Sequence, residues 1–161
     1  MFNTYLSFQI HCILAVKFKE ALIQKKWEDQ LHQFLHKAIR ANYHQLIAAS
    51  NVPDHLHMII SVRATESVDD LIEKIKTETE EWIRMKKFVD VPFSWQDGYA
   101  AFSCSQESIT GLIKYLHRQE DYHKRITFLD EYRQYLNEYG IEFEEADLFT
   151  EPESYYTYAE Q

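Results

Sequence analysis

The chain has 161 residues, with 26 acidic and 17 basic side chains and a formal net charge of −9. Hydrophobic residues make up 45% and aromatic residues 15%, which supports a sizeable core and excludes global disorder. Three glycines and three prolines exclude collagen-like and linker-rich architectures, and two cysteines exclude a disulfide framework. The bulk charge also argues against a generically basic nucleic-acid binder.

The acidic excess is concentrated toward the end of the chain. Residues 1–64 carry 7 basic and 4 acidic side chains, residues 65–125 carry 9 and 12, and residues 126–161 carry 1 and 10. The first two segments cancel, so the whole imbalance belongs to the third. An acidic block of this kind is typical of a solvated face or tail. We therefore predict one domain over 1–143 and an acidic C-terminal tail over 144–161.

Features of a secreted or membrane-spanning protein are missing from the sequence. No run of about 18 apolar residues is present, and the first residues lack a basic region followed by a small-residue cleavage site. Cys12 and Cys104 fit a reducing compartment. The sequence also contains no P-loop and no GxGxxG motif. We expect a cytoplasmic protein with no membrane partner and no nucleotide cofactor.

Hydrophobic periodicity predicts elements that alternate between strand and helix. Leu6, Phe8 and Ile10 fall on one side of an extended chain, whereas Trp27 and Leu31 follow helical spacing. In chain order, the sequence predicts a strand over 4–16, a helix over 26–43, a short apolar run over 46–49, a strand over 55–62, a helix over 67–87 with Ser67 as its N-cap, a strand over 93–104 bent at Gly98, a helix over 106–124 and an amphipathic helix over about 128–139.

The predicted order is β-α-β-β-α-β followed by helices. This order is that of an α+β, ferredoxin-like split βαβ sandwich. We expect an antiparallel sheet with helices on one face, plus a C-terminal helix. The second face of the sheet is expected to stay available for a ligand or partner.

A Pro-Asp-His-Leu-His run over 53–57 leads into the predicted strand over 55–62. Side chains two positions apart on a strand project from the same face, so His55 and His57 can offer two imidazoles to one metal ion. Leu56 then points into the core. Two polar histidines on a half-exposed strand are an equally good interpretation of this motif alone.

Tyr115 and Gln119 are four residues apart in the predicted third helix, and therefore lie on one helical face. A tyrosine can act as a covalent nucleophile when the group that it attacks is polarised, and a divalent cation polarises a phosphoryl group. The amide oxygen of Gln119 could complete a His/His/Gln ligand set, and mixed nitrogen and oxygen ligands suit Mg²⁺ or Mn²⁺. Alternatively, the two residues have no functional role and are a helix-edge tyrosine and a surface glutamine. Spacing alone favours this interpretation.

These motifs resemble those of the single-tyrosine HUH transposases of small bacterial insertion sequences, the IS200-like family, and of the related REP-associated tyrosine transposases. His55-Leu56-His57 corresponds to the His-hydrophobic-His motif. The run Trp95 to Ser103, followed by Tyr115-x-x-x-Gln119, corresponds to the second signature. The resemblance covers roughly residues 3–143, with both motifs in the expected order and spacing. Ala100 stands where a second glycine is expected, and the acidic tail is unusual for a DNA enzyme.

The resemblance implies an enzyme that cleaves and rejoins single-stranded DNA at transposon ends through a covalent 5′-phosphotyrosine. It implies Tyr115 as the nucleophile and His55, His57 and Gln119 as ligands of Mg²⁺ or Mn²⁺. Further implications are a homodimer and DNA hairpins near the ends as the recognition feature. Whether Tyr115 serves the site of its own subunit or that of its partner stays open.

Several other residues lie close to the predicted site. Lys114 and Arg118 share the helix of Tyr115 and are the first candidates for DNA phosphate contacts. We expect His11 to have a structural role or to support a metal ligand. Asp54 either orients a histidine or caps the turn before it.

Two other functions compete with the leading hypothesis. One is a domesticated, REP-associated transposase-like nuclease that processes dispersed host repeats. The other is a non-catalytic module that binds single-stranded nucleic acid on its sheet, although the sequence lacks an RNP-type aromatic motif.

Overall fold

A four-stranded antiparallel sheet forms the centre of the protein, in the order β2-β3-β1-β4. The computed structural model describes residues 3–17 and 22–148. The strands are β1 (Phe8–Ala15), β2 (Gln45–Val52), β3 (His55–Val62) and β4 (Ala100–Cys104). The helices are α1 (Lys25–Ala41), α2 (Val68–Lys86), α3 (Ile109–Leu116), α4 (Gln119–Tyr122) and α5 (Phe128–Glu138), with 3₁₀ turns η2 (Gln106–Ser108) and η3 (Glu145–Asp147).

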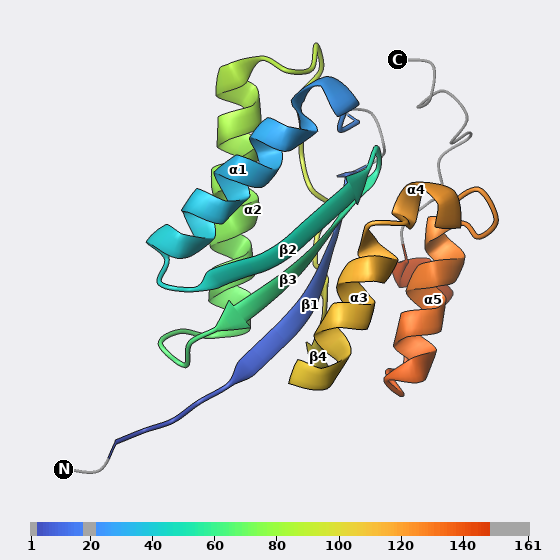
Figure 1. Ribbon diagram of the computed structural model, residues 1–161. Helices are drawn as coiled ribbons and strands as arrows, with labels where there is room; N and C mark the ends of the chain where they lie inside the picture. The colour runs from blue at the N-terminus through green and yellow to red at the C-terminus, as the bar shows by residue number, and fades with distance from the viewer. Residues whose placement is uncertain (1–2, 18–21, 149–161) are drawn as a thin grey trace.

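This element order and strand order confirm the ferredoxin-like split βαβ fold. Helices α1 and α2 lie on one face of the sheet, and α3, α4 and α5 lie on the other (Figure 1). The second face is therefore covered by the C-terminal helices, and the expectation that it stays open is wrong. No helix among the described residues has the length and apolar composition needed to cross a membrane.

Strand alternation builds a separate core on each face of the sheet. In β3, Leu56, Met58 and Ile60 point toward α1 and α2 and are fully buried. On the opposite face, Ile13 and Phe102 pack with side chains of α5. Because the period of a strand is two, His55 and His57, which flank Leu56, must point toward the C-terminal helices.

The helix predicted over 106–124 is interrupted. It begins with a 3₁₀ turn, continues as α3 and then breaks between Leu116 and Gln119. The hydroxyl of Ser50 on β2 donates a 2.6 Å hydrogen bond to the carbonyl oxygen of Leu116. Arg118 has φ −105 and ψ 14, outside the helical region, before the chain turns again into α4. The sheet therefore fixes the end of α3, which periodicity alone could not predict.

Other predicted boundaries shift by a few residues. Ser67 caps α2 as predicted, since its hydroxyl accepts a 3.0 Å hydrogen bond from the amide of Asp70; such a cap contributes roughly 1 kcal/mol. The last strand begins at Ala100 rather than at residue 93, because Gly98 turns the chain with φ +74. The first strand begins at Phe8 rather than at residue 4.

Candidate metal and nucleophile site

The two histidines of the His-Leu-His motif lie on the face of β3 that α5 covers. Both are 0% exposed, so the alternative interpretation as two polar histidines on a half-exposed strand does not hold. Asp54 Oδ1 lies 2.8 Å from His55 Nδ1. A carboxylate oxygen only accepts a hydrogen bond, so Nδ1 is the protonated nitrogen and Nε2 carries the lone pair. Asp54, itself 2% exposed, thus orients His55 with Nε2 toward the cluster beneath α5.

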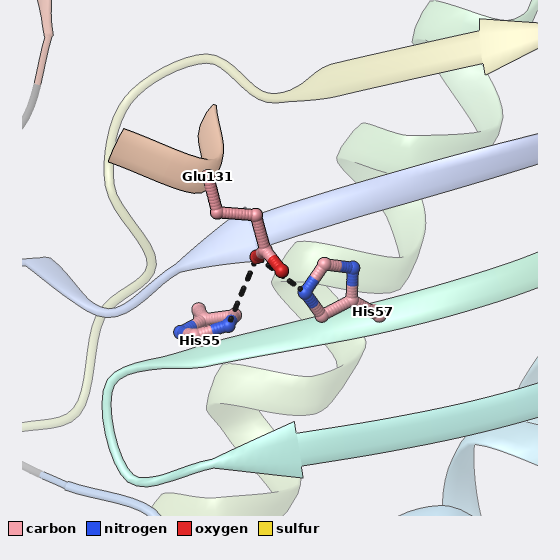
Figure 2. Close-up of side chains that lie close together, drawn as sticks. All are labelled: His55, His57 and Glu131. Atoms are coloured by element: carbon pink, nitrogen blue, oxygen red, sulfur yellow. Dashed lines mark hydrogen bonds and ion pairs between the residues drawn. The ribbon is translucent and has the colours of Figure 1, made fainter. Parts of the chain in front are cut away.

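His11 supports the second histidine of the motif. It lies on β1 next to β3, and its Nε2 is 2.8 Å from Nδ1 of His57. The two rings stack at 5.0 Å between centroids. This contact leaves Nε2 of His57 to face Glu131 (Figure 2). The supporting position expected for His11 is thus the position that it occupies.

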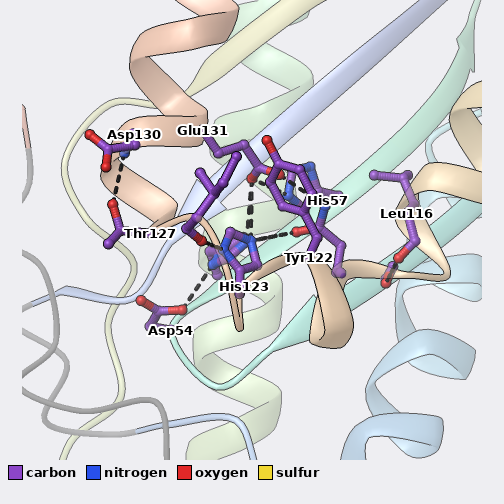
Figure 3. A network of polar contacts seen from close by, with 12 residues as sticks. Asp54, His57, Leu116, Tyr122, His123, Thr127, Asp130 and Glu131 are labelled. Atoms are coloured by element: carbon purple, nitrogen blue, oxygen red, sulfur yellow. Dashed lines mark hydrogen bonds and ion pairs between the residues drawn. The ribbon is translucent and has the colours of Figure 1, made fainter.

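Glu131 of α5 is the acidic group at the centre of the cluster. Its side chain is 1% exposed, and Oε1 lies 3.1 Å from His57 Nε2 and 3.8 Å from His55 Nε2. The ligand atoms of these three residues all lie within 4.8 Å of one another. Thr127 caps the start of α5 by accepting a 3.1 Å hydrogen bond from the amide of Asp130 (Figure 3). The cap fixes the first turn of the helix that delivers the carboxylate.

The other oxygen of Glu131 contacts the predicted nucleophile and the predicted amide ligand. The hydroxyl of Tyr115 donates a hydrogen bond to Oε2, and Nε2 of Gln119 donates a 2.9 Å hydrogen bond to the same oxygen. Gln119 is 1% exposed, so it is not a surface residue. One carboxylate thus joins Tyr115 to His57, and all of these groups belong to a single chain.

His123 completes the cluster between α4 and α5. Its Nδ1 donates a 2.9 Å hydrogen bond to the carbonyl oxygen of Ile126, and its Nε2 lies 2.8 Å from Oε1 of Gln119. Nε2 is also 3.5 Å from Oε1 of Glu131 (Figure 3). A protonated imidazole satisfies both oxygens, because each can only accept.

Charges in the cluster shift its ionisation. Burial alone would raise the pKa of Glu131, but hydrogen bonds from His123 and His57 hold that pKa well below its usual range. Burial lowers the pKa of His57, and Glu131 opposes this shift only in part. Although burial lowers the pKa of His123, its hydrogen bond and attraction to Glu131 raise it above the ordinary value. Burial and the negative charge of Glu131 raise the pKa of Tyr115 far above its ordinary value, so its phenol is neutral.

The donor atoms of the cluster fit a divalent cation. Nε2 of His55 carries a lone pair, yet it faces Oε1 of Gln119 at 3.3 Å and Oε1 of Glu131 at 3.8 Å. His123 donates to the two oxygens, but the lone pair of His55 Nε2 faces only acceptors, and a cation between the three atoms would satisfy it. Imidazole nitrogens with carboxylate and amide oxygens form a mixed ligand set suited to Mn²⁺ or Mg²⁺.

The sequence prediction identified four members of this cluster and missed two. The structure brings together His55, His57, Tyr115 and Gln119, while Lys114 and Arg118 are exposed on the same segment. The missed members are Glu131 and His123. A signal for Glu131 was available, because it falls with Phe128, Tyr132 and Tyr135 at i, i+3, i+4 and i+7 spacing. A carboxylate within the apolar stripe of a helix is a candidate for a buried functional group.

Comparison with known proteins identifies the class. Residues 4–119 match the family described as Transposase IS200 like. The ISDra2 transposase TnpA of Deinococcus radiodurans is 21% identical over 122 residues, which cover 70% of this chain and 84% of that protein. These matches define the class as transposases, which are DNA-processing enzymes. The chain belongs to the IS200-like transposase family.

Two solved structures share the fold. One is described as a candidate transposase from Deinococcus radiodurans, with 17% identity and a TM-score of 0.59 over 74% of this chain and 95% of that chain. The other is a REP-associated tyrosine transposase bound to a REP hairpin, with 12% identity and a TM-score of 0.57 over 78% of this chain and 74% of that chain. At these identities the likeness concerns the fold alone.

Proposed function

We propose that this transposase cleaves and rejoins single-stranded DNA through a covalent link between Tyr115 and a 5′-phosphate. The observation that carries the proposal is the shared carboxylate, because Glu131 contacts the Tyr115 hydroxyl with one oxygen and His57 with the other. The nucleophile and the candidate metal ligands thus meet at one point of a single chain. Tyr115 is therefore proposed to act at the site of its own subunit.

His55, His57 and Glu131, together with Gln119, would hold the metal ion, which we propose to be Mg²⁺ or Mn²⁺. When bound, such an ion neutralises charge on a phosphoryl oxygen and makes the phosphorus easier to attack. Gln119 donates a hydrogen bond to the oxygen of Glu131 that accepts from Tyr115, and its own amide oxygen faces His55. The binding of the metal and the position of the nucleophile are therefore coupled. Buried ligands on rigid elements suit a site that must hold its geometry.

The reaction begins with the neutral phenol of Tyr115. Its hydroxyl donates a hydrogen bond to Oε2 of Glu131, which orients the phenol oxygen, and the proton passes to water as the bond to phosphorus forms. The bond from phosphorus to the 3′-oxygen of the upstream nucleotide breaks. The departing 3′-oxygen takes up a proton from water, so the products are a 5′-phosphotyrosine and a free 3′-hydroxyl. Attack of a 3′-hydroxyl on the phosphotyrosine reverses these steps and rejoins the strand.

The DNA partner is proposed to carry hairpins near the cleaved ends, and the hairpin bound by the REP-associated neighbour supports this proposal. Lys114 and Arg118 would contact phosphates of the single strand beside Tyr115, because both are exposed on the segment that carries the nucleophile. We further propose a cytoplasmic homodimer. Tyr5 and Leu6, which are 85% and 56% exposed before β1, provide apolar surface for contact with a second copy.

The division into a catalytic domain over 1–143 and an acidic tail over 144–161 is also a proposal. The tail holds six acidic side chains and no basic one, and residues 149–161 lie outside the described part of the chain. We propose that its charge limits nonspecific binding to duplex DNA. Deletion of 144–161 should then raise duplex affinity at low salt, and unchanged affinity would exclude this role.

The experiment for the proposed function compares two tyrosine variants. Single strands copied from both flanks of the gene, labelled at the 3′ end, are incubated with Mn²⁺, and covalent adducts are separated on a denaturing gel. Tyr115→Phe should give no adduct, because it lacks the attacking oxygen. Tyr99→Phe is the matched control, since Tyr99 packs against the core beneath α1 and α2 and loses a hydrogen bond to Asp69. An adduct with Tyr115→Phe would overturn the assignment.

A further inference from the structure

A cleft of about 380 Å³ opens beside Tyr115, between α3 and α5. This volume lies within the range of about 300–1,000 Å³ that is usual for small-ligand sites. The residues proposed to hold the metal do not line the cleft. Tyr115 lines it and also contacts Glu131 of the metal site. We name it the tyrosine cleft, and its principal lining residues are Gly111, Tyr115, Tyr122, Gln134, Tyr135 and Tyr139.

The aromatic walls of the tyrosine cleft are held in fixed positions. Tyr135 and Tyr139 stack on the buried ring of Phe102, at 5.4 and 4.7 Å between centroids. The hydroxyl of Tyr139 donates a 3.0 Å hydrogen bond to the carbonyl oxygen of Ser103 on β4. On the other side, Tyr122 meets Tyr115 edge to face. Rigid aromatic faces beside open space are the feature on which unpaired nucleobases stack.

Gly111 keeps the α3 side of the cleft open. It sits inside a helix, where glycine costs roughly 0.5–1 kcal/mol relative to alanine. Its φ lies outside the left-handed region, and a Cβ built on it meets no heavy atom within 4 Å. Neither backbone conformation nor close packing therefore requires glycine here. A larger side chain at this position would project into the space that the tyrosines surround.

The polar rim of the cleft distinguishes a base from a phosphate. Gln134 and Glu138 of α5 line the cleft and are exposed. The negative charge of Glu138 repels a phosphate but can accept a hydrogen bond from a base edge. The exposed cation of the neighbouring helix, Lys114, lies one residue before the nucleophile, where a phosphate is expected. The base and the phosphate of a bound nucleotide would therefore contact different side chains around Tyr115.

We propose that the tyrosine cleft binds one unstacked nucleobase that flanks the cleaved phosphate. This inference rests on the proposed function, because it takes single-stranded DNA as the substrate. Stacking between Tyr115, Tyr135 and Tyr139 would fix the nucleotide and with it the orientation of the phosphate toward the Tyr115 hydroxyl. The cleft is thereby a substrate-positioning site next to the reacting atoms.

The test compares Gly111→Leu, which fills the cleft, with Gly111→Ala, which leaves most of it open. Each variant and the wild type are titrated by fluorescence anisotropy, at low salt with EDTA, against two probes. One probe is an oligothymidylate of about twelve nucleotides, and the other is an abasic deoxyribose-phosphate strand of the same length. Thermal unfolding monitored by circular dichroism checks that both variants fold.

The wild type and Gly111→Ala should bind the oligothymidylate about 5- to 150-fold more tightly than the abasic strand, as expected for one stacked base. Gly111→Leu should lose at least about fivefold of that preference and keep its affinity for the abasic strand. If Gly111→Leu keeps the preference of the wild type, the proposal is overturned.

Crosslinking supplies a measurement that does not depend on a variant. A mixed-sequence strand that contains 5-iodouracil is irradiated on the wild type, and the attached peptides are identified. Attachment at Tyr122, Tyr135 or Tyr139 is expected, and attachment confined to other regions would overturn the proposal. The adduct assay separates the two proposals: an adduct on Tyr115 without cleft crosslinks leaves only the proposed function. Cleft crosslinks without any adduct leave only the base site.

Discussion

The hydroxyl of Tyr115 donates its hydrogen bond to Oε2 of Glu131, a carboxylate that lies sixteen residues further along the chain and is delivered by a different helix. Oε1 of the same group lies 3.1 Å from Nε2 of His57. The phenol and the imidazole therefore communicate through one buried anion. A change at Glu131 must alter both the position of Tyr115 and the affinity of the histidines for a cation.

The first prediction concerns metal affinity. Glu131→Gln should weaken Mn²⁺ binding at least about tenfold, because a neutral amide replaces the anionic ligand. Binding is measured by electron paramagnetic resonance of free Mn²⁺, without DNA. Glu138→Gln is the control, since it removes the same charge from an exposed position on the same helix. Equal affinities for both variants and the wild type would show that Glu131 is not a ligand.

The second prediction concerns stability against pH, measured by urea unfolding in EDTA. Burial, together with repulsion from His57, lowers the pKa of His11 to about 3. Below about pH 6.5 the unfolded chain therefore binds a proton that the folded chain refuses, so stability falls as pH falls, by up to about 1.4 kcal/mol per unit. The lowered pKa of His57 acts in the same direction. Between about pH 7 and pH 5, His11 alone should remove about 2 kcal/mol.

Two other groups of the cluster act outside this window. The raised pKa of His123 gives stability that is already complete below about pH 6.5, so it does not change the slope there. The lowered pKa of Glu131 gives stability that is lost only below about pH 4.5. His11→Gln should therefore reduce the slope between about pH 6.5 and pH 5 by about one proton. A variant with the slope of the wild type would contradict this prediction.

The third prediction separates stability from positioning. Ser50→Ala removes the 2.6 Å hydrogen bond to the Leu116 carbonyl, which should cost about 1 kcal/mol and loosen the end of α3 next to Tyr115. Ser67→Ala removes the N-cap of α2 on the opposite face of the sheet, at a similar cost. We expect slower adduct formation with Ser50→Ala only. Equal rates for the two variants, at matched unfolding midpoints, would argue against a positioning role.

The fourth prediction concerns the phosphate contacts. Lys114→Gln and Arg118→Gln should each weaken binding to single strands of any sequence. Each should also reduce the slope of log affinity against log salt by about 0.7. Lys37→Gln, on the exposed side of α1, is the control on the other face of the sheet. A slope that changes as much for Lys37→Gln would indicate a general charge effect instead of contacts beside Tyr115.

Local patterns were sufficient for most of the fold. The alternation in β3 predicts that Leu56 enters the core and that His55 and His57 share the opposite face, because strand geometry has a period of two. Ser67 caps its helix through contacts within four residues. Features of this kind depend on neighbours in the sequence and can be predicted without knowledge of distant segments.

Non-local contacts limited the prediction of α3 and of the second face. The break after Leu116 depends on a hydroxyl 66 residues earlier in the chain, at Ser50. The apolar surface of α5 explains why the second face is closed, since Phe128 buries its ring against His55 at 3.6 Å between centroids. Periodicity records that a helix has an apolar face, but it does not record which surface that face covers.

The formal net charge of −9 is a property of the sequence alone. The distribution of the charged residues along the chain indicated a neutral catalytic region followed by an acidic end. The sequence also determined the two histidines, Tyr115 and Gln119 as candidates, because their spacing is local. Only the tertiary structure decided that Glu131 joins them. Packing α5 against the sheet brings this carboxylate 3.1 Å from His57, across 74 residues of sequence. An acidic residue is costly to bury alone, and the histidines and Tyr115 supply the hydrogen bonds that stabilise it there.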